Sequence, residues 1–531
     1  MTAREPAGGL VPPDLDRSPE SIGRYLEDAA HYPGGAATGI ARPRHEGEVA
    51  ALVRSAARLL VVGAQSSLTG GATPAGDIVL STERLTSIEP VGVSGVRVGA
   101  GVSLDALQAW LAARGRWYPP VPTFTGASAG GVVSTNAAGA ATFKYGTTRT
   151  WVDGLTVVLA CGHVLELERG RVRAHPHDGF RIECACGTRQ VRPGSYQLPE
   201  VPKCSAGYFA APEMDLIDLF IGAEGTLGII VTATFRTLPA RPAVAMAIVP
   251  APTETDAIAL TGNLRDVAKA TWANGDPQGL DVAAIEQLDR RCLEILREDG
   301  VADRCRVSWP NDTAMALLVQ IELPPGTTAA RGFDQVAAAF APGAPVTPLG
   351  RFCQLLDRYH VFDHTQLALP GDERRAQHFL EFREGAPVGV NRRVAEAGRT
   401  TGDRRIQKTA ADMIVPFDRF GEMLARYHDG YRRRGLDHAI WGHISDGNVH
   451  PNVIPCSYDD VVAGQEAILE FGAAVQACGG CPLAEHGVGR SPLKQALLRT
   501  FLGDDAIGQM RAIKRALDPE YKLARGVVIE A

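Results

Sequence analysis

The sequence has no long hydrophobic run, no excess of basic charge and few aromatic residues. No stretch approaches the roughly 18 uninterrupted apolar residues that a membrane-spanning helix needs, so we expect no transmembrane segment. The net charge of -6 argues against a dedicated nucleic-acid-binding protein, since such proteins usually carry a basic stripe. Residues 1–13 lack the basic and then apolar pattern of a secretory signal. We therefore expect a soluble, cytoplasmic protein.

The ten cysteines do not form the dense framework of a small secreted domain. They are spread over much of the chain, and the spacing CxxC occurs once, at Cys478–Cys481. The runs of closely spaced cysteines that bind iron–sulfur clusters are absent. We expect reduced thiols, in agreement with a cytoplasmic location, and assign them no function.

A chain of 531 residues is too long for one hydrophobic core and predicts two or three domains. Short apolar runs alternate with amphipathic stretches from Ile40 onward, which indicates mixed helix and sheet. Residues 152–167 are predicted to form a β-hairpin that turns at Cys161–His163, and residues 170–202, being polar and rich in Arg, Gly and Pro, an extended loop. Leu219–Arg236 carries two strand-like runs around a glycine-rich bend. The prolines of residues 239–252 mark a domain boundary.

Three tracts rich in glycine and small residues follow one another in the first half of the chain. They are residues 63–71, residues 122–146 and residues 222–228. Such tracts expose successive backbone N–H groups, which bind phosphate. Val96–Gly101 begins like a dinucleotide-binding fingerprint, but the third glycine is missing because position 104 is leucine, and no Walker A motif is present. Three tracts in one domain indicate a long, phosphate-bearing ligand of another kind.

A second group of residues lies in the C-terminal half, in Trp441-Gly-His-Ile-Ser-Asp-Gly-Asn-Val-His450. The turn-forming residues 445–448 separate His443 from His450 and would fold the two imidazoles towards one point. Two imidazoles and a carboxylate form a common site for a divalent metal such as Zn²⁺, and Glu485 is the candidate carboxylate. Histidines that flank a turn can also act only as capping groups, and from the residues alone both interpretations stay open.

The ordered tracts resemble the FAD-binding (PCMH-type) domain of the vanillyl-alcohol-oxidase flavoproteins, in the branch of the D-lactate, D-2-hydroxyglutarate and glycolate dehydrogenases. The resemblance covers about residues 40–530 and implies FAD. The first loop has Gln65-Ser66-Ser67 where several members carry a flavin-linked histidine, so the FAD is expected to be non-covalent. The cofactor-binding residues that the resemblance implies are Gly63, Ala64, Gln65, Ser66, Ser67, Leu68, Thr69, Gly70, Pro122, Thr123, Gly126, Ala127, Ser128, Gly130, Gly131, Thr135, Asn136, Gly139, Tyr145, Gly146, Glu224, Gly225 and Gly228.

The same resemblance implies the remaining site residues. In that branch two histidines and a glutamate hold a divalent metal, usually zinc, which here implies His443, His450 and Glu485. The catalytic residues that it implies are His486 as the base, Arg383 at the substrate carboxylate, and Lys408 and Asn452 at the substrate. Pro387 stands where the D-2-hydroxyglutarate enzyme has threonine, which leaves the substrate side chain open.

The expected fold is α+β, with a two-subdomain FAD-binding domain at residues 1–242. A substrate- and metal-binding α+β domain with an antiparallel sheet is expected at 243–488, and a helical segment at 489–531 that packs back on the FAD domain. The expected activity is FAD- and metal-dependent oxidation of a D-2-hydroxy acid to the 2-oxo acid. The alternatives are a metal-independent flavin oxidase of a phenol or alcohol, and a flavin subunit of an electron-transfer complex. The electron acceptor (quinone, cytochrome, electron-transfer flavoprotein or oxygen) and the oligomeric state stay open, with a homodimer as one alternative.

Overall fold

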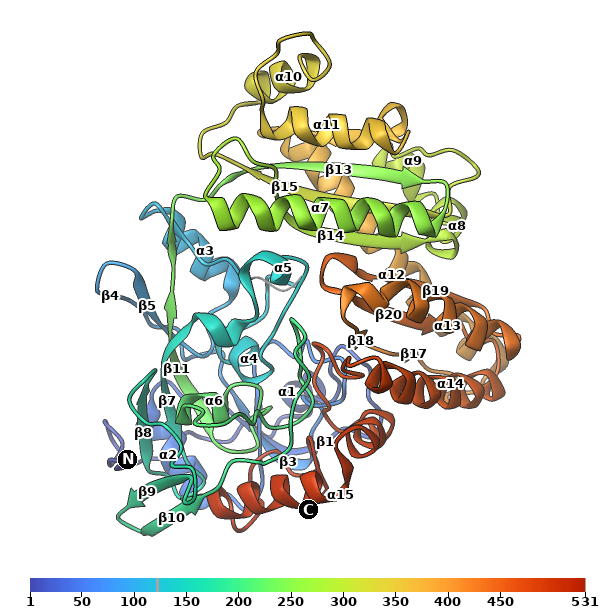
Figure 1. Ribbon diagram of the computed structural model, residues 1–531. Coiled ribbons are helices and arrows are strands. Elements are labelled where there is room, and N and C mark those ends of the chain that lie inside the picture. The colour runs from blue at the N-terminus through green and yellow to red at the C-terminus, as the bar shows by residue number, and fades with distance from the viewer. Residues whose placement is uncertain (121–123, 531) are drawn as a thin grey trace. The chain divides into compact units, whose positions relative to one another are not determined.

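The computed structural model describes residues 1–120 and 124–530 (Figure 1). The chain divides into two compact units. Unit 1 contains Met1–Gly139, Gly146–Pro239 and the C-terminal segment that starts at Cys481. Unit 2 contains Ala140–Tyr145 and Ala240–Gly480.

A parallel sheet forms the first layer of unit 1. Its strand order is β1-β3-β2, with β1 at Ala36–Ala41, β2 at Leu59–Val62 and β3 at Ala75–Ser81. Helix α2 (Glu46–Ser55) connects β1 to β2, as parallel strands require, and its apolar residues share a core with β2 and β3. The His45 side chain caps α2 by accepting a hydrogen bond from the Glu48 N–H.

The second sheet of unit 1 is antiparallel. Its order is β4-β5-β11-β7-β8, and its strands are β4 Ile88–Val91, β5 Gly95–Gly99, β7 Val152–Val158, β8 Val164–Glu168 and β11 Ile229–Arg236. Strands β7 and β8 form the predicted hairpin, and its turn contains Cys161–His163. The interpretation of Leu219–Arg236 as two strands is wrong in its first part, because Asp215 caps a short helix, α6, at Leu216–Phe220.

A second correction concerns residues 170–202, which were expected to form an extended loop. They contain a two-stranded hairpin, β9 (Phe180–Cys184) and β10 (Gly187–Val191). Phe180 and Ile182 are buried while Arg181 and Glu183 are exposed, which is the period of two that a strand with one buried face requires. Figure 1 shows this hairpin beside α15 (Pro492–Leu517), and β10 contacts that helix.

The remaining elements of unit 1 are short. They are α1 Pro19–Gly23, α3 Leu104–Ala112, β6 Arg116–Trp117, α4 Ala129–Ser134, η1 Thr148–Trp151 and β12 Leu238–Pro239. Helix α15 is interrupted at Gly503, whose φ of 83° lies in the left-handed region.

Unit 2 is built on one antiparallel sheet of order β16-β13-β15-β14-β19-β20-β17, with β18 paired to β20. The strands are β13 Ala243–Ala251, β14 Asp281–Asp289, β15 Met315–Leu323, β16 Gln366–Ala368, β17 Thr409–Ala410, β18 Met413–Ile414, β19 His438–His443 and β20 Asn448–Val453. Figure 1 shows α7 (Glu254–Asn274) lying along β13, β14 and β15. The antiparallel sheet expected for the second half is confirmed.

Other helices complete unit 2. They are α5 Thr142–Tyr145, α8 Arg290–Glu298, α9 Val301–Cys305, α10 Ala329–Ala337, α11 Pro348–Arg358, η2 Phe362–His364, α12 Glu373–Thr401, η3 Phe417–Arg419, α13 Phe420–Arg433, η4 Ile444–Asp446 and α14 Tyr458–Ala477. Leu293 of α8 and Phe382 of α12 share a core with Trp441 of β19. This packing places one face of α12 next to the strands that carry the candidate site.

Within residues 1–120 and 124–530, no helix combines the length and the apolar character needed to cross a bilayer.

Candidate functional site

The first predicted flavin-binding loop, residues 63–70, begins where parallel strand β2 ends. Its conformation is held by its own side chains, because Ser67 Oγ accepts hydrogen bonds from the N–H groups of Thr69 and Gly71. Gln65 has a φ of 54°, and its Nε2 donates to the Glu27 carbonyl at 2.9 Å. The loop is therefore a defined turn that presents small side chains and backbone at the end of a parallel strand.

The second tract lies against the first. Ser128 caps α4 by accepting from the Gly131 N–H, and a Cβ atom at Gly63 would lie 2.1 Å from Ser128 Oγ. Only glycine fits at position 63 without displacing the cap. A Cβ at Gly130 would likewise lie 2.6 Å from the Cβ of Ala100. The predicted cofactor residues Pro122 and Thr123 lie outside the described residues.

The third tract adjoins the second within unit 1. The Glu224 N–H donates to the Ser134 carbonyl at 2.8 Å, and the Gly222 N–H donates to the Val133 carbonyl. Asn136, in the left-handed region at φ 48°, accepts from the Arg149 N–H through its side chain. Within unit 1, the described parts of the three tracts thus form one surface of close backbone approaches, which suits an extended ligand such as FAD.

Glu224 joins this surface to the segment after His486. Its carboxylate accepts hydrogen bonds from the N–H groups of Val488 (2.8 Å) and Gly489 (2.9 Å). Burial raises the pKa of Glu224 to about 7, against an opposing contribution from these two hydrogen bonds. Glu224 therefore positions the backbone that follows the predicted catalytic base.

Tyr145, predicted to bind the cofactor, belongs to unit 2, unlike the other described residues of the predicted cofactor set. Its hydroxyl donates to Glu322 Oε2 at 2.5 Å, and Lys144 Nζ lies 2.6 Å from Asp281 Oδ2. Burial and the neighbouring Glu322 carboxylate raise the pKa of Tyr145 well above its usual value. The phenol thus remains protonated and acts as a hydrogen-bond donor.

The two predicted metal-binding histidines lie on adjacent strands of unit 2. His443 ends β19, and His450 pairs with Trp441 across the β19–β20 hairpin. Gly447, with a φ of 83°, forms the turn between the strands. The imidazole rings are buried and perpendicular, with 5.7 Å between their centroids. The prediction that the turn brings the two rings together is confirmed.

Each of these rings faces a buried carboxylate through Nδ1. His443 Nδ1 lies 3.6 Å from Glu286 Oε2, and His450 Nδ1 lies 3.6 Å from Asp412 Oδ1. Asn448 Nδ2 donates to the same Asp412 oxygen at 3.1 Å. Metal-binding histidines commonly have a carboxylate close to the ring, which helps to orient it. The two buried imidazoles of unit 2 therefore fit a divalent metal as ligands.

The predicted substrate-binding residues of unit 2 differ in their surroundings. Arg383 is buried on α12, where Nε donates to Glu286 and Nη1 donates to Glu384 Oε1 at 2.6 Å. Asn452 is buried on β20, and its Nδ2 donates to the His450 carbonyl at 2.7 Å. Lys408 is exposed in the segment before β17. Arg383 thus contacts Glu286, the carboxylate beside His443, and Asn452 contacts the predicted metal ligand His450 directly.

Glu485 and His486 belong to unit 1. Glu485 is buried, and its Oε2 lies 3.1 Å from Nζ of Lys203, whose side chain is fully buried. His486 Nε2 lies 3.6 Å from Glu485 Oε1. The ion pair with Lys203 offsets part of the cost of burying the Glu485 carboxylate.

Three residues that support the site were not predicted from the sequence as part of it. Glu286 is a buried charged residue in strand β14, and a buried carboxylate is itself a signal of an internal partner. Asp412 and Lys203 lie in irregular segments, and their partners are distant in sequence. Their pairing depends on the tertiary fold, so no local pattern in the sequence indicates it.

The chain is similar in sequence to known proteins. Residues 37–168 match the FAD binding domain, and residues 253–528, more than half of the chain, match the C-terminal domain of the FAD linked oxidases. The chain is 30% identical to D-2-hydroxyglutarate dehydrogenase of Xanthomonas citri pv. viticola over 92% of this chain and 89% of that protein. It is 25% identical to D-lactate dehydrogenase of Archaeoglobus fulgidus, covering 92% of this chain and 91% of that protein.

The fold is also similar to that of a solved structure, alkyldihydroxyacetonephosphate synthase. The TM-score is 0.57 at 14% identity, covering 99% of this chain and 88% of the other. The family matches, the relatives and the mixed helix-and-sheet fold agree with the resemblance that the glycine tracts and the histidine hairpin indicated. The protein belongs to the FAD-linked oxidase family.

Proposed function

We propose that the protein oxidises a D-2-hydroxy acid to the corresponding 2-oxo acid, with FAD as the oxidant and a divalent metal as a second cofactor. The observation that carries the proposal is the pair of buried imidazoles on β19 and β20, each with a carboxylate 3.6 Å from Nδ1. An oxidase of phenols needs no such pair. The relatives named as D-2-hydroxyglutarate and D-lactate dehydrogenases support the same substrate class.

The FAD is proposed to bind non-covalently along the three glycine tracts of unit 1. Gln65, Ser66 and Ser67 offer no histidine for a flavin link in the first loop. Bound FAD would accept the α-hydrogen of the substrate as a hydride at N5. The backbone N–H groups and small side chains of residues 63–71 and 126–131 would bind and orient the cofactor and keep water from its phosphates.

The metal is proposed to be held by His443, His450 and Glu485, with zinc as the expected ion. Such an ion would act as a Lewis acid on the substrate hydroxyl. Glu286 and Asp412 lie beside the two imidazoles and are proposed to orient them, and Lys203 pairs with the Glu485 carboxylate. This chain therefore supplies the ligands and also the groups that orient them.

Substrate binding and proton removal are assigned to the remaining residues. His486 is proposed to remove the hydroxyl proton, since an imidazole accepts a proton near neutral pH. Arg383 is proposed to bind the substrate carboxylate. Its Nε and Nη1 already face protein carboxylates, which leaves Nη2 as the nitrogen for this contact. Asn452 and Lys408 are proposed to contact the substrate, with the exposed Lys408 nearer its distal end.

The domain boundaries, the cellular location and the class of electron acceptor are also proposed. The FAD-binding domain would comprise residues 1–242 together with the returning segment 489–531, and the substrate- and metal-binding domain residues 243–488. The break between the compact units after Pro239 supports the first boundary, whereas residues 481–488 cluster with unit 1 rather than with unit 2. The ten free cysteines support a reducing, cytoplasmic location. The electron acceptor is one of quinone, cytochrome, electron-transfer flavoprotein or oxygen.

Anaerobic titration of the oxidised flavoprotein with paired D- and L-2-hydroxy acids tests the proposal. The acids should include lactate, glycolate and 2-hydroxyglutarate. We expect one D-acid or glycolate to bleach the flavin absorbance while the L-enantiomers leave it unchanged. Bleaching by a phenol or simple alcohol, with none by any hydroxy acid, would replace this function with that of a metal-independent oxidase.

A further inference from the structure

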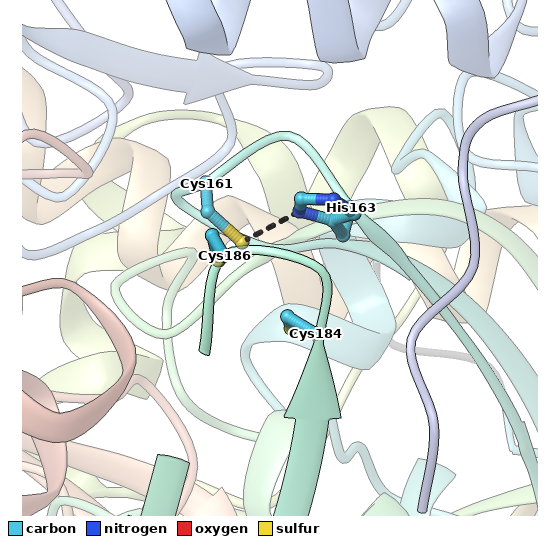
Figure 2. A group of neighbouring side chains, drawn as sticks. All are labelled: Cys161, His163, Cys184 and Cys186. Atoms are coloured by element: carbon cyan, nitrogen blue, oxygen red, sulfur yellow. Dashed lines mark hydrogen bonds between the residues drawn. The ribbon is translucent and has the colours of Figure 1, made fainter. Parts of the chain in front are cut away.

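Four potential metal ligands meet in unit 1, in a part of the protein that the proposed reaction does not use. Cys161 and His163 lie in the turn between β7 and β8, and Cys184 and Cys186 lie at the turn between β9 and β10 (Figure 2). The three sulfur atoms and one ring nitrogen all lie within 4.8 Å of one another. Cys184 and Cys186 lie on the β9–β10 hairpin, within residues 170–202, which were expected to form a loop.

The local structure explains why these side chains meet. Gly162, with a φ of 78°, tightens the β7–β8 turn between Cys161 and His163. In the second hairpin, Cys184 pairs with Gly187, so a two-residue turn places Cys184 and Cys186 on the same end. Three of the ten cysteines are thus gathered from segments more than twenty residues apart.

The N-terminal segment fastens the two hairpins together beside this cluster. The Ala3 N–H donates to the Glu183 carbonyl of β9 at 2.7 Å, and the Arg4 N–H donates to the Val164 carbonyl of β8 at 2.9 Å. The next residue, Glu5, places its Oε1 3.0 Å from His163 Nε2. The other ring nitrogen, Nδ1, lies 3.3 Å from Cys161 Sγ. His163 is therefore oriented by a carboxylate and presents Nδ1 to the thiols.

We propose that Cys161, His163, Cys184 and Cys186 bind one zinc ion at a structural site that links the two hairpins. A tetrahedral ion with Zn–S of about 2.3 Å and Zn–N of about 2.0 Å separates its ligand atoms by ~3.5–3.8 Å, and the four ligand atoms of the cluster lie within 4.8 Å of one another, so binding requires them to move closer by at most about 1 Å. Three thiolates and one imidazole form a closed set with no position for water, which is typical of structural rather than catalytic zinc.

The surroundings supply what a thiolate-rich zinc site needs. Three thiolates and Zn²⁺ carry one net negative charge, and the Arg189 guanidinium lies 3.5 Å from Cys186 Sγ through Nη2. Arg189 Nη1 is itself fixed by the Ala516 carbonyl of α15. Glu5 provides the carboxylate that metal-bound histidines commonly contact through their second nitrogen. The zinc would thus connect the N-terminal segment, both hairpins and, through Arg189, the C-terminal helix.

Metal analysis of protein purified under reducing conditions, without chelators, tests the site. The informative variant is Cys186→Ser, because Cys186 is exposed and its loss removes no core packing, and the control is Cys456→Ser, another exposed free cysteine. We expect Cys186→Ser to lose about one equivalent of zinc relative to the wild type, and Cys456→Ser to lose none. Equal zinc content in wild type and Cys186→Ser would overturn the proposal.

Cobalt substitution separates this site from the proposed catalytic metal. Tetrahedral Co²⁺ bound to thiolates absorbs strongly in the red, where oxidised flavin does not absorb. We expect these bands in the wild type and in His443→Ala, and their absence in Cys186→Ser. Bands that persist in Cys186→Ser would overturn the assignment. A second contrary result would be an intact mass of the freshly purified wild type that is lower than expected by two hydrogens, with no such deficit in Cys186→Ser. This result would show a disulfide in place of the ion.

Glu5 provides a finer test of the geometry. Glu5→Gln removes the carboxylate that orients His163 but none of the four ligands, and loss of such a partner typically weakens metal binding by about 10–100-fold. We expect zinc to be retained at stoichiometric concentration but to transfer more readily to a competing chelator. Unchanged competition would contradict the orientation of His163 by Glu5.

Discussion

His443 Nδ1 lies 3.6 Å from Glu286 Oε2, and the same oxygen accepts a hydrogen bond from Arg383 Nε. One buried carboxylate therefore contacts both a proposed metal ligand and the proposed substrate-binding arginine. The second imidazole has a carboxylate of its own, Asp412, which is shared with Asn448 rather than with an arginine. This difference allows the orientation of the imidazoles to be tested separately from the stability of the buried arginine.

Asp412→Asn should weaken metal binding and leave the fold intact. The amide keeps an oxygen that can accept from Asn448 but removes the charge that faces His450, so we expect metal affinity at this site to fall by about 10–100-fold. A chelator competition in the Cys186→Ser background reports this site alone. An affinity equal to that of the background protein would show that Asp412 does not orient a metal ligand.

Glu286→Gln should destabilise the protein, because it leaves the Arg383 charge buried without its main partner. Breaking a buried ion pair typically costs about 3–5 kcal/mol of the free energy of unfolding. The matched control is Glu384→Gln, which removes the exposed partner of the same guanidinium and should cost no more than about 1 kcal/mol. Denaturant titration measures both. Equal effects of the two substitutions would contradict a central role for the Glu286–Arg383 pair.

His486→Gln should slow flavin reduction without releasing FAD or the metal. A positioned general base commonly contributes about 10²–10⁴-fold to the rate, so we expect a loss in that range in anaerobic stopped-flow experiments. The limb of the pH–rate profile that reports ionisation of the base should also disappear. His364→Gln, at an exposed histidine of unit 2, serves as the control. A wild-type rate of flavin reduction in His486→Gln would exclude this residue as the base.

Glu224 should make the stability of the protein depend on pH. Its pKa is raised from 4.5 to about 7 in the folded protein, chiefly by burial, so the folded state binds this proton more tightly than the unfolded state does. The resulting stabilisation is fully present below pH 4.5 and is lost as the pH rises towards 7. We expect the free energy of unfolding to fall less over this interval in Glu224→Gln. Parallel curves for the two proteins would contradict the raised pKa.

Local signals predicted much of the fold and part of the site. The turn residues 445–448 predicted the meeting of His443 and His450, because hairpin geometry depends on nearby residues alone. The β9–β10 hairpin was missed because the polar composition of residues 170–202 concealed the alternation of Phe180 and Ile182. The first part of Leu219–Arg236 was misassigned because the helix cap at Asp215 lies upstream of the apolar run.

The carboxylates behind the histidines could not be predicted in the same way. Glu286 lies more than 150 residues before His443 in the chain, and only the pairing of β14 with β19 brings them together. The cysteine cluster likewise depends on two hairpins and the N-terminal segment, which no spacing rule connects. Sequence patterns report neighbours along a helix, strand or turn, whereas these contacts arise from tertiary packing.

The most direct test of the account is anaerobic flavin reduction by the active D-2-hydroxy acid before and after metal removal. The Cys186→Ser variant should be used, so that the chelator acts on the proposed catalytic site. We predict that the chelated protein keeps its FAD but is no longer bleached by the acid, and that added Zn²⁺ restores bleaching, whereas His443→Ala in the same background is not restored. Bleaching at the full rate by metal-free protein would contradict the central claim.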